Sequence, residues 1–144
     1  MSGSTERPLT VERTLELAVP LARVWRALTD PEELARWFPD QVEQAKLEPG
    51  VTGRFTWERH GSFAFRLEAV EPERRLVWRW ARDAGTPLED GVTTTIEWRL
   101  EARADGGTTL RLCESGFVRP EDQEGNSKGW DSELAELVEL LGTG

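Results

Sequence analysis

Glu114 is the acidic residue whose position most favours a chemical role. It follows Leu110 and Leu112 on the same side of an expected strand, so the alternation of side chains directs it toward the apolar face. A carboxylate buried there would need a partner, and Arg13 and Arg59 share the inward orientation in their own expected strands. Because alternation often fails at strand ends, we favour a solvated Glu114. The alternative is a buried general acid or base.

The other residue types that commonly carry catalysis are scarce. The single histidine, His60, lies in an expected turn, and the single cysteine, Cys113, points outward with no histidine near it in sequence. One histidine and one cysteine do not make a zinc site or a two-histidine iron site. The sequence also lacks a glycine-rich phosphate loop and the spacing of a calcium loop. We therefore expect no metal and no cofactor, and we favour a protein that is not an enzyme.

Aromatic rings are concentrated on one side of the expected sheet. The chain has seven Trp, five Phe and no Tyr. Two interpretations are open: the rings fill the space beneath a covering helix, or they leave a gap shaped for a flat or apolar ligand. Each buried indole N–H also needs an acceptor from the backbone, water or a ligand. For a ligand, we expect the contacts to be Trp37, Phe38, Phe55, Trp57, Phe65, Trp78, Trp80, Trp98, Glu114, Trp130 and Leu134.

A C-terminal helix, expected at 127–141, is the element that must cover these rings. Its apolar stripe has helical spacing and consists of Trp130, Leu134, Leu137, Val138 and Leu141. We expect the acids on the other side to face solvent, namely Asp131, Glu133, Glu136 and Glu139. The polar stretch at 119–128 is expected to be a mobile connector.

The rest of the chain predicts a sheet preceded by two short helices. A strand is expected at 11–19, followed by helices at 21–28 and 31–38, with Asp30 as the N-cap of the second. From 43 to 117 the apolar period is two, with turns at Gly and Pro. The pattern predicts an α+β fold with an antiparallel meander of six to seven strands, a strand at 43–47 among them, and one apolar face. We expect a flexible N-terminus at 1–9 and a single domain at 10–144.

Composition limits the class of protein and its partners. The net charge is −9, and eight acidic against two basic residues lie between Glu114 and Gly144, so binding to nucleic acid is not expected. One cysteine excludes an internal disulfide, and no apolar run is long enough to span a membrane. We expect a soluble, cytoplasmic protein whose oligomeric state the sequence leaves open.

Local sequence phrases resemble one branch of the START-like (SRPBCC, helix-grip) superfamily, the bacterial homologues of the activator of heat-shock protein 90 ATPase. The phrases occur in the family's order along nearly the whole chain. They are Val24-Trp25-Arg26-Ala27-Leu28-Thr29-Asp30-Pro31, Arg36-Trp37-Phe38, Leu76-Val77-Trp78-Arg79-Trp80, Gly107-Thr108-Thr109-Leu110, Ser115-Gly116-Phe117 and Gly129-Trp130.

The resemblance implies a curved sheet and a long C-terminal helix with a cavity between them, which holds a small apolar or amphipathic molecule in many relatives. It implies no particular reaction, because relatives include lipid carriers, cyclases and chaperone regulators. Two features depart from the family. Thr52-Gly53 stands where relatives usually have Gly-Gly, and the eukaryotic activator carries a further chaperone-binding domain for which we expect no room in this chain.

Three functions follow as hypotheses. The leading one is binding of a small hydrophobic or aromatic molecule between the sheet and the C-terminal helix. The second is a cyclase-like or hydrolase-like enzyme that uses Glu114 in that cavity. The third is a regulator that binds a chaperone or another protein partner, which the polar outer face of the expected sheet disfavours.

Overall fold

A computed structural model describes residues 9–143 and has the predicted α+β architecture. One antiparallel sheet contains seven strands in the order β1-β7-β6-β5-β4-β3-β2. The strands are β1 (Val11–Leu17), β2 (Gln41–Gln44), β3 (Thr52–Trp57), β4 (Gly61–Glu71), β5 (Arg75–Ala81), β6 (Thr93–Ala102) and β7 (Thr108–Ser115). Apart from Leu9, the N-terminal stretch predicted to be flexible lies outside the described residues. The meander and its connectivity are therefore confirmed.

Two short helices, α1 (Leu21–Thr29) and α2 (Pro31–Trp37), follow β1 as predicted. Asp30 lies between them and its carboxylate accepts a hydrogen bond from the backbone N–H of Glu32 at 3.0 Å. Proline at the first position and two acids in the first turn favour the start of α2. Helix α2 ends at Trp37, so the rings of Trp37 and Phe38 lie side by side where the chain enters β2.

Helix α3 (Pro120–Thr143) is longer than predicted. The stretch at 119–128, predicted to be a connector, is helical from Pro120, with acids in its first turn that suit the helix dipole. Gly125 and Gly129 lower the intrinsic helix propensity there, which concealed the helix in the sequence pattern. The predicted stripe is buried except for Val138, which is 44% exposed. No helix within residues 9–143 combines the length and apolar character needed to cross a membrane.

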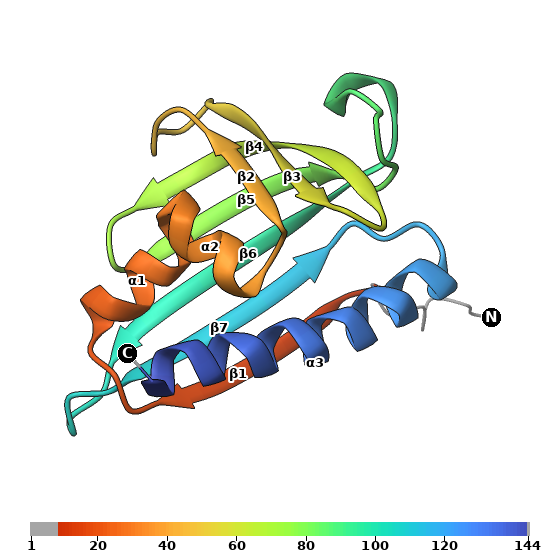
Figure 1. Ribbon diagram of the computed structural model, residues 1–144. Coiled ribbons are helices and arrows are strands. Elements are labelled where there is room, and N and C mark those ends of the chain that lie inside the picture. The colour runs from red at the N-terminus through yellow and green to blue at the C-terminus, as the bar shows by residue number, and fades with distance from the viewer. Residues whose placement is uncertain (1–8, 144) are drawn as a thin grey trace.

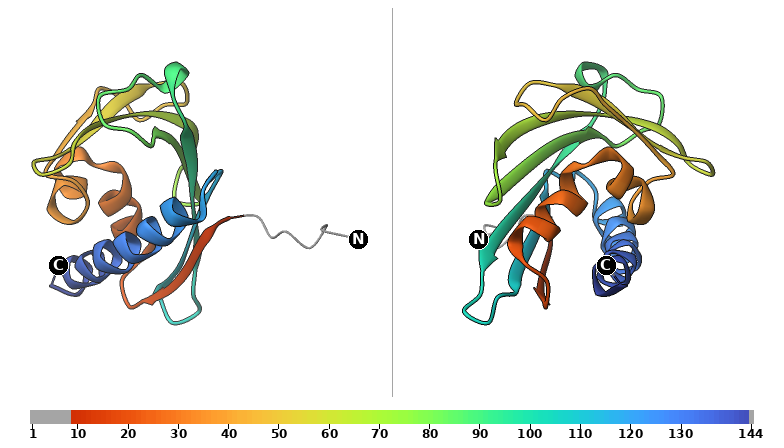
Figure 2. Two further views of the ribbon diagram at one scale, coloured as in Figure 1. Left: turned by 90° about the vertical axis from the view of Figure 1, so that its right-hand side faces the viewer. Right: turned by 60° about the vertical axis from the view of Figure 1, so that its left-hand side comes forward.

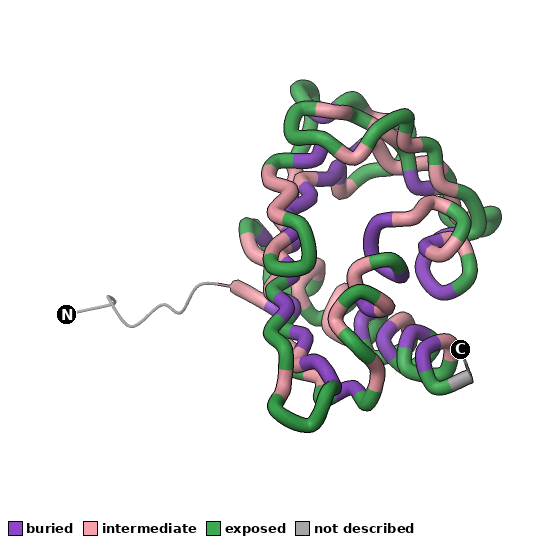
Figure 3. Tube along the Cα trace, turned by 90° about the vertical axis from the view of Figure 1, so that its left-hand side faces the viewer, coloured by how far each residue is buried: buried purple, intermediate pink, exposed green. Residues whose placement is uncertain are grey.

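The sheet curls around the helices. Figures 1 and 2 show α3 and the α1–α2 pair on the same concave side of the sheet. A bulge in β4, between Leu67 and Ala69, interrupts the register with β5 and adds to the curvature. Buried positions line this concave side and the inner faces of the helices (Figure 3). Nearly all the aromatic rings therefore pack between the sheet and the helices, as predicted.

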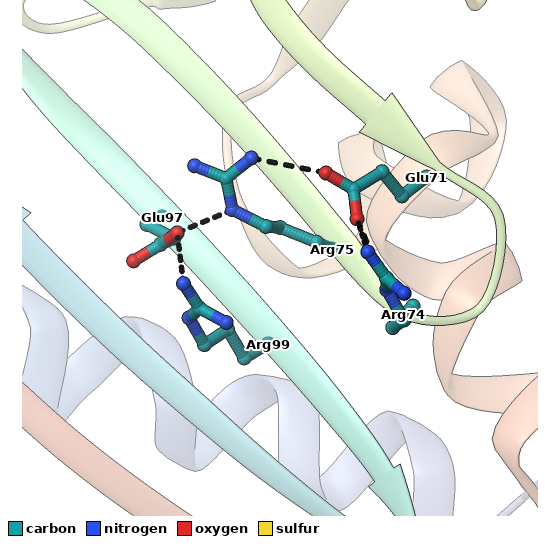
Figure 4. Close-up of polar contacts among 5 residues, drawn as sticks. All are labelled: Glu71, Arg74, Arg75, Glu97 and Arg99. Carbon is teal, nitrogen blue, oxygen red and sulfur yellow. Dashed lines mark hydrogen bonds and ion pairs between the residues drawn. The ribbon is translucent and has the colours of Figure 1, made fainter.

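The convex face of the sheet carries charges held in ion pairs. Arg75 bridges Glu71 and Glu97, while Arg99 contacts Glu97 at 3.1 Å and Arg74 contacts Glu71 (Figure 4). Burial alone would raise the pKa of the Glu97 carboxyl, but Arg75 and Arg99 more than offset burial and lower it. These ion pairs make the described part of the convex face around Arg75 and Glu97 polar.

The other edge of the sheet differs from the sequence expectation. The strand expected at 43–47 is observed as Gln41–Gln44. At this edge Gly53 allows a close approach of neighbouring groups. A Cβ atom at Gly53 would lie 2.1 Å from the carbonyl oxygen of Glu43 and 2.5 Å from the ring of Phe65. Glycine is therefore required there by packing.

We expect Gly53→Ala to destabilise the protein by about 2 kcal/mol, because the methyl group would push β2 away from β3 or displace the Phe65 ring. Urea denaturation measures the loss. Gly125→Ala is the matched control, since a Cβ atom there meets nothing within 4 Å and alanine favours a helix. A Gly53→Ala protein as stable as the Gly125→Ala protein would contradict the packing role of Gly53.

Candidate functional site

The carboxylate of Glu114 is wholly buried and accepts four hydrogen bonds. Its Oε2 atom accepts from the indole N–H of Trp80 at 2.8 Å and from the hydroxyl of Thr94 at 2.6 Å. Its Oε1 atom accepts from the side-chain amide of Asn126 at 2.9 Å and from the indole N–H of Trp130 at 2.7 Å. The expectation of a solvated strand end is therefore wrong, because Glu114 has an exposed fraction of 0%.

Strand alternation continues through Glu114 because β7 is flanked on both sides at this point. Val11 of β1 and Ile96 of β6 are its neighbours in register. Helix α3 begins a few residues after the strand and folds back, which brings Asn126 and Trp130 over the carboxylate. The strand end is thus covered by the segment that the sequence pattern predicted to be a connector.

The two arginines considered as possible partners of Glu114 do not pair with it. Arg13 does face α3, but its guanidinium contacts Asp131 at 2.9 Å and the hydroxyl of Ser127 at 2.8 Å. Arg59 is exposed in the turn between β3 and β4. The contacts of Arg13 instead fix the first half of α3 to β1.

Asn126 connects Glu114 to a different arginine, Arg82. The guanidinium of Arg82 donates to the Asn126 side-chain oxygen at 3.0 Å, and the Asn126 amide donates to Glu114. Arg82 also lies near the rings of Trp80, at 6.0 Å, and Phe117, at 5.5 Å. The buried negative charge is therefore coupled to a positive charge through one amide, without a direct ion pair.

A small hollow lies between α3 and the sheet, next to this network. Its volume is about 90 Å³. Phe38 and Trp130 are stacked with centroids 5.3 Å apart, while Phe38 and Trp57 meet edge to face at 5.1 Å. Seven residues line it: Phe38, Trp57, Trp80, Asn126, Gly129, Trp130 and Glu133. The rings thus leave a gap, but most of the space beneath α3 is filled.

The residues predicted to contact a ligand divide into two groups. Phe38, Trp57, Trp80 and Trp130 line the hollow, and Glu114 lies directly behind two of them. The others are buried in the core away from the hollow: Trp37, Phe55, Phe65, Trp78, Trp98 and Leu134.

Most of the buried indole N–H groups donate hydrogen bonds to acceptors of the protein itself. Trp37 donates to the carbonyl of Ala27 at 2.8 Å, and Trp57 donates to the carbonyl of Phe38 at 3.1 Å. The indole nitrogen of Trp98 is buried without a hydrogen-bond partner. Three other indoles meet the Trp98 ring edge to face, with centroids 6.0, 5.8 and 5.6 Å away: Trp37, Trp78 and Trp130.

Glu133 is the lining residue with an unusual carboxyl group, and the sequence pattern assigned it to the solvent side. It is half-buried at the mouth of the hollow. Burial, followed by the charges of Glu136 and Asp40, raises its pKa to about 7, while the indole of Trp57 opposes the shift. A helical wheel places Glu133 beside Trp130, three residues earlier, which is the signal that would have found it.

The remaining candidates do not form a second site. Burial raises the pKa of the Cys113 thiol, and the carboxylates of Glu12 and Glu97 add to this, so the reactive thiolate is disfavoured. His60 is exposed in the turn between β3 and β4. Within residues 9–143, no three His, Cys, Asp or Glu side chains are grouped to hold a metal ion.

The carboxyl groups of Glu114 and Glu133 have different surroundings and therefore different chemical roles. Glu114 has both oxygens occupied by donors and is shielded from the hollow by Trp80 and Trp130. Glu133 borders the hollow, and its pKa lies close to neutral pH, where a carboxyl group can gain or lose a proton. Any polar contact with a molecule in the hollow therefore falls to Glu133.

Solved structures of other proteins share this architecture. A protein from Mesorhizobium loti is 28% identical, with a TM-score of 0.79 over 93% of this chain and 97% of its own. DynU16, from the dynemicin biosynthetic locus, is 28% identical, with a TM-score of 0.80. The match covers 95% of this chain but only 48% of DynU16. Aha1 from Colwellia psychrerythraea, described as a dimer, is 20% identical with a TM-score of 0.77 over 92% and 95% of the two chains, and shows the fold alone.

A comparison with curated proteins found no match. The family described as "Activator of Hsp90 ATPase homolog 1-like protein" matches residues 18–142, which include every element from α1 to the end of the apolar stripe of α3. The resemblance seen in the sequence phrases is confirmed, and the chain belongs to this family of START-like proteins.

Proposed function

We propose that this protein binds a small hydrophobic or aromatic molecule in the hollow between α3 and the sheet. The observation that carries the proposal is a gap walled by four aromatic side chains in a core that is otherwise filled. Apolar walls with a few placed polar groups are typical of ligand sites. The family's fold is consistent with binding in this position.

The volume limits what can enter. A hollow of about 90 Å³ is well below the roughly 300 to 1,000 Å³ of a pocket that encloses a drug-sized ligand. One small group of a ligand fits, and the rest of the molecule would lie at the mouth, against Gly129 and Glu133. Burying about 100 Å² of apolar surface contributes about 2.5 kcal/mol, so this group alone would give weak binding.

The geometry supports binding over catalysis by Glu114. All four contacts of its carboxylate are with donors, which leaves no lone pair directed at the hollow. A general acid or base must reach the atom whose proton it transfers, and two indole rings separate Glu114 from that space. We assign Glu114 a positioning role: it sets the orientation of Trp80 and Trp130.

The first prediction concerns the hollow itself. Gly129→Leu should occupy the hollow and abolish binding of toluene, used as a small neutral aromatic probe, while the helix keeps or gains stability because leucine replaces glycine. The measurement is the change in the NMR signal of the Trp57 indole N–H during titration. Gly125→Leu, in the same helix but away from the hollow, should bind the probe normally. Toluene that fails to shift the Trp57 signal in the unaltered protein would refute the proposal.

The second prediction concerns Glu114. Glu114→Gln replaces one acceptor oxygen by an NH₂ group that faces two donors, so we expect a loss of about 2 to 3 kcal/mol in the free energy of unfolding. Urea denaturation measures this loss, and Glu124→Gln, an exposed change of the same kind in α3, should have little effect. Unchanged stability in Glu114→Gln would contradict the positioning role and favour the enzyme alternative.

A further inference from the structure

We propose that the group received by the hollow is a cation, the positively charged nitrogen of an amine or a quaternary ammonium compound. This inference rests on the proposed function and names the chemical class of the ligand. Four aromatic side chains and one carboxyl group surround the same small space, which is the composition that a cationic head group requires.

The aromatic walls offer π surface, because their polar atoms are engaged elsewhere. The N–H groups of Trp80 and Trp130 both donate to Glu114. The N–H of Trp57 donates to the backbone carbonyl of Phe38 and also interacts with the Glu133 carboxyl group, whose pKa it lowers. What these rings present to the hollow is therefore carbon and the negative face of the π system, which attracts a cation without a hydrogen bond.

The polar lining contains one acid and no base. Among the described residues that border the hollow, Glu133 is the charged one, and Asn126 has both ends of its amide engaged by Arg82 and Glu114. The nearest cation, Arg82, does not border the hollow, and through Asn126 its charge is coupled to the buried carboxylate. The positive and negative charges of that relay offset one another, which leaves Glu133 as the uncompensated group.

Other acids around Glu133 strengthen this local preference. Glu136 lies one helical turn along α3, and Asp40 approaches from the segment between α2 and β2, where it accepts a hydrogen bond from the backbone of Glu58 at 2.7 Å. On the side of α2, Arg36 lies with Glu136 in a neighbouring depression. Glu136 and Asp40 thus add negative charge near Glu133, and a cation bound beside Glu133 would relieve the repulsion among these carboxylates.

The size of the hollow agrees with a cationic head group. A hollow of about 90 Å³ suits a compact group such as a methylated nitrogen better than an extended ring system. Such a head group needs no hydrogen-bond donor from the protein, and the N–H groups of the three indoles that line the hollow are already engaged. An anionic head group would instead meet Glu133 and the negative faces of the rings.

A cation should bind the ionised form of Glu133, so its affinity should depend on pH. The pKa of Glu133 is raised to about 7 by burial first and by Glu136 and Asp40 next, so the carboxyl group is largely protonated at pH 5.5 and ionised at pH 8. By linkage, the affinity for a cation should rise by about tenfold or more between these two values. A neutral molecule of the same shape should show no such gain.

Choline and dimethylbutanol, in which a carbon atom replaces the charged nitrogen, provide a matched pair of probes. We expect choline to shift the Trp57 and Trp130 indole signals in NMR titrations, with tighter binding at pH 8 than at pH 5.5. Choline should also bind more tightly than dimethylbutanol at pH 8. Glu133→Gln should remove both the pH dependence and the preference for choline, whereas Glu124→Gln, an exposed acid of the same helix, should keep them.

The outcomes are distinguishable. If dimethylbutanol binds in the hollow as tightly as choline at pH 8, the cation inference is wrong and the proposed function stands. If neither probe shifts the two indole signals, the cation inference is wrong, and the toluene titration decides the proposed function separately. If choline shifts only the NMR signals of residues near other acidic side chains, and not those of the two indoles, it binds to the protein surface outside the hollow. The cation inference is then also wrong.

Without any probe, the ionisation of Glu133 should appear in the stability of the protein. A carboxyl group whose pKa is raised by folding stabilises the folded state below its unfolded pKa, and this contribution is lost as pH rises through the folded value. We therefore expect the urea midpoint to fall between pH 5 and pH 8, and to fall less in Glu133→Gln than in Glu124→Gln. Equal slopes in the two variants would show that Glu133 keeps an ordinary pKa, and would overturn the pH dependence proposed for cation binding.

Discussion

The buried carboxylate of Glu114 joins β5, β6 and β7 to α3, and the arrangement of the site depends on it. Removing a carboxylate from water costs several kcal/mol unless strong partners replace the lost hydration. Here two indoles, a hydroxyl and an amide occupy both oxygens at 2.6 to 2.9 Å. Each donor comes from a different turn or strand, so the carboxylate can be satisfied only when α3 lies in one position on the sheet.

The hollow is a consequence of this constraint. Because Trp80 and Trp130 direct their N–H edges at Glu114, their rings cannot rotate to fill the neighbouring space. Trp57 is held in a similar way by the carbonyl of Phe38, which follows α2. Gly129 supplies no side chain at the remaining boundary. The gap therefore lies where three indoles have been committed to polar partners, and rigid walls of this kind are suited to recognition.

Much of the fold was predictable from the sequence, whereas the site was predictable only in part. Alternation along β3 to β7 and the cap at Asp30 are local signals, and local signals gave the strands and short helices correctly. Trp80 and Trp130 were correctly expected to point inward. The burial of Glu114 depends on a contact with Asn126, which lies in a segment whose helical pattern is weakened by Gly125 and Gly129. Contacts that form only when distant segments meet have no periodic signature.

The two carboxyl groups that face the interior of the protein differ in what compensates them. Glu114 has four donors and a cation linked through an amide, so it is complete without a ligand. Glu133 has one indole and two acidic neighbours, and its raised pKa expresses that shortage. A structural carboxylate stabilises the fold because hydrogen-bond donors of the protein fill its acceptor sites. A recognition carboxylate keeps its affinity for a ligand because such donors are lacking. Glu133 lies about one helical turn from Trp130, beside the rings that Glu114 holds in place, and it is the carboxyl group suited to recognition. Because Glu114 fixes the positions of these rings, the space beside Glu133 has a defined shape, which makes binding at Glu133 selective.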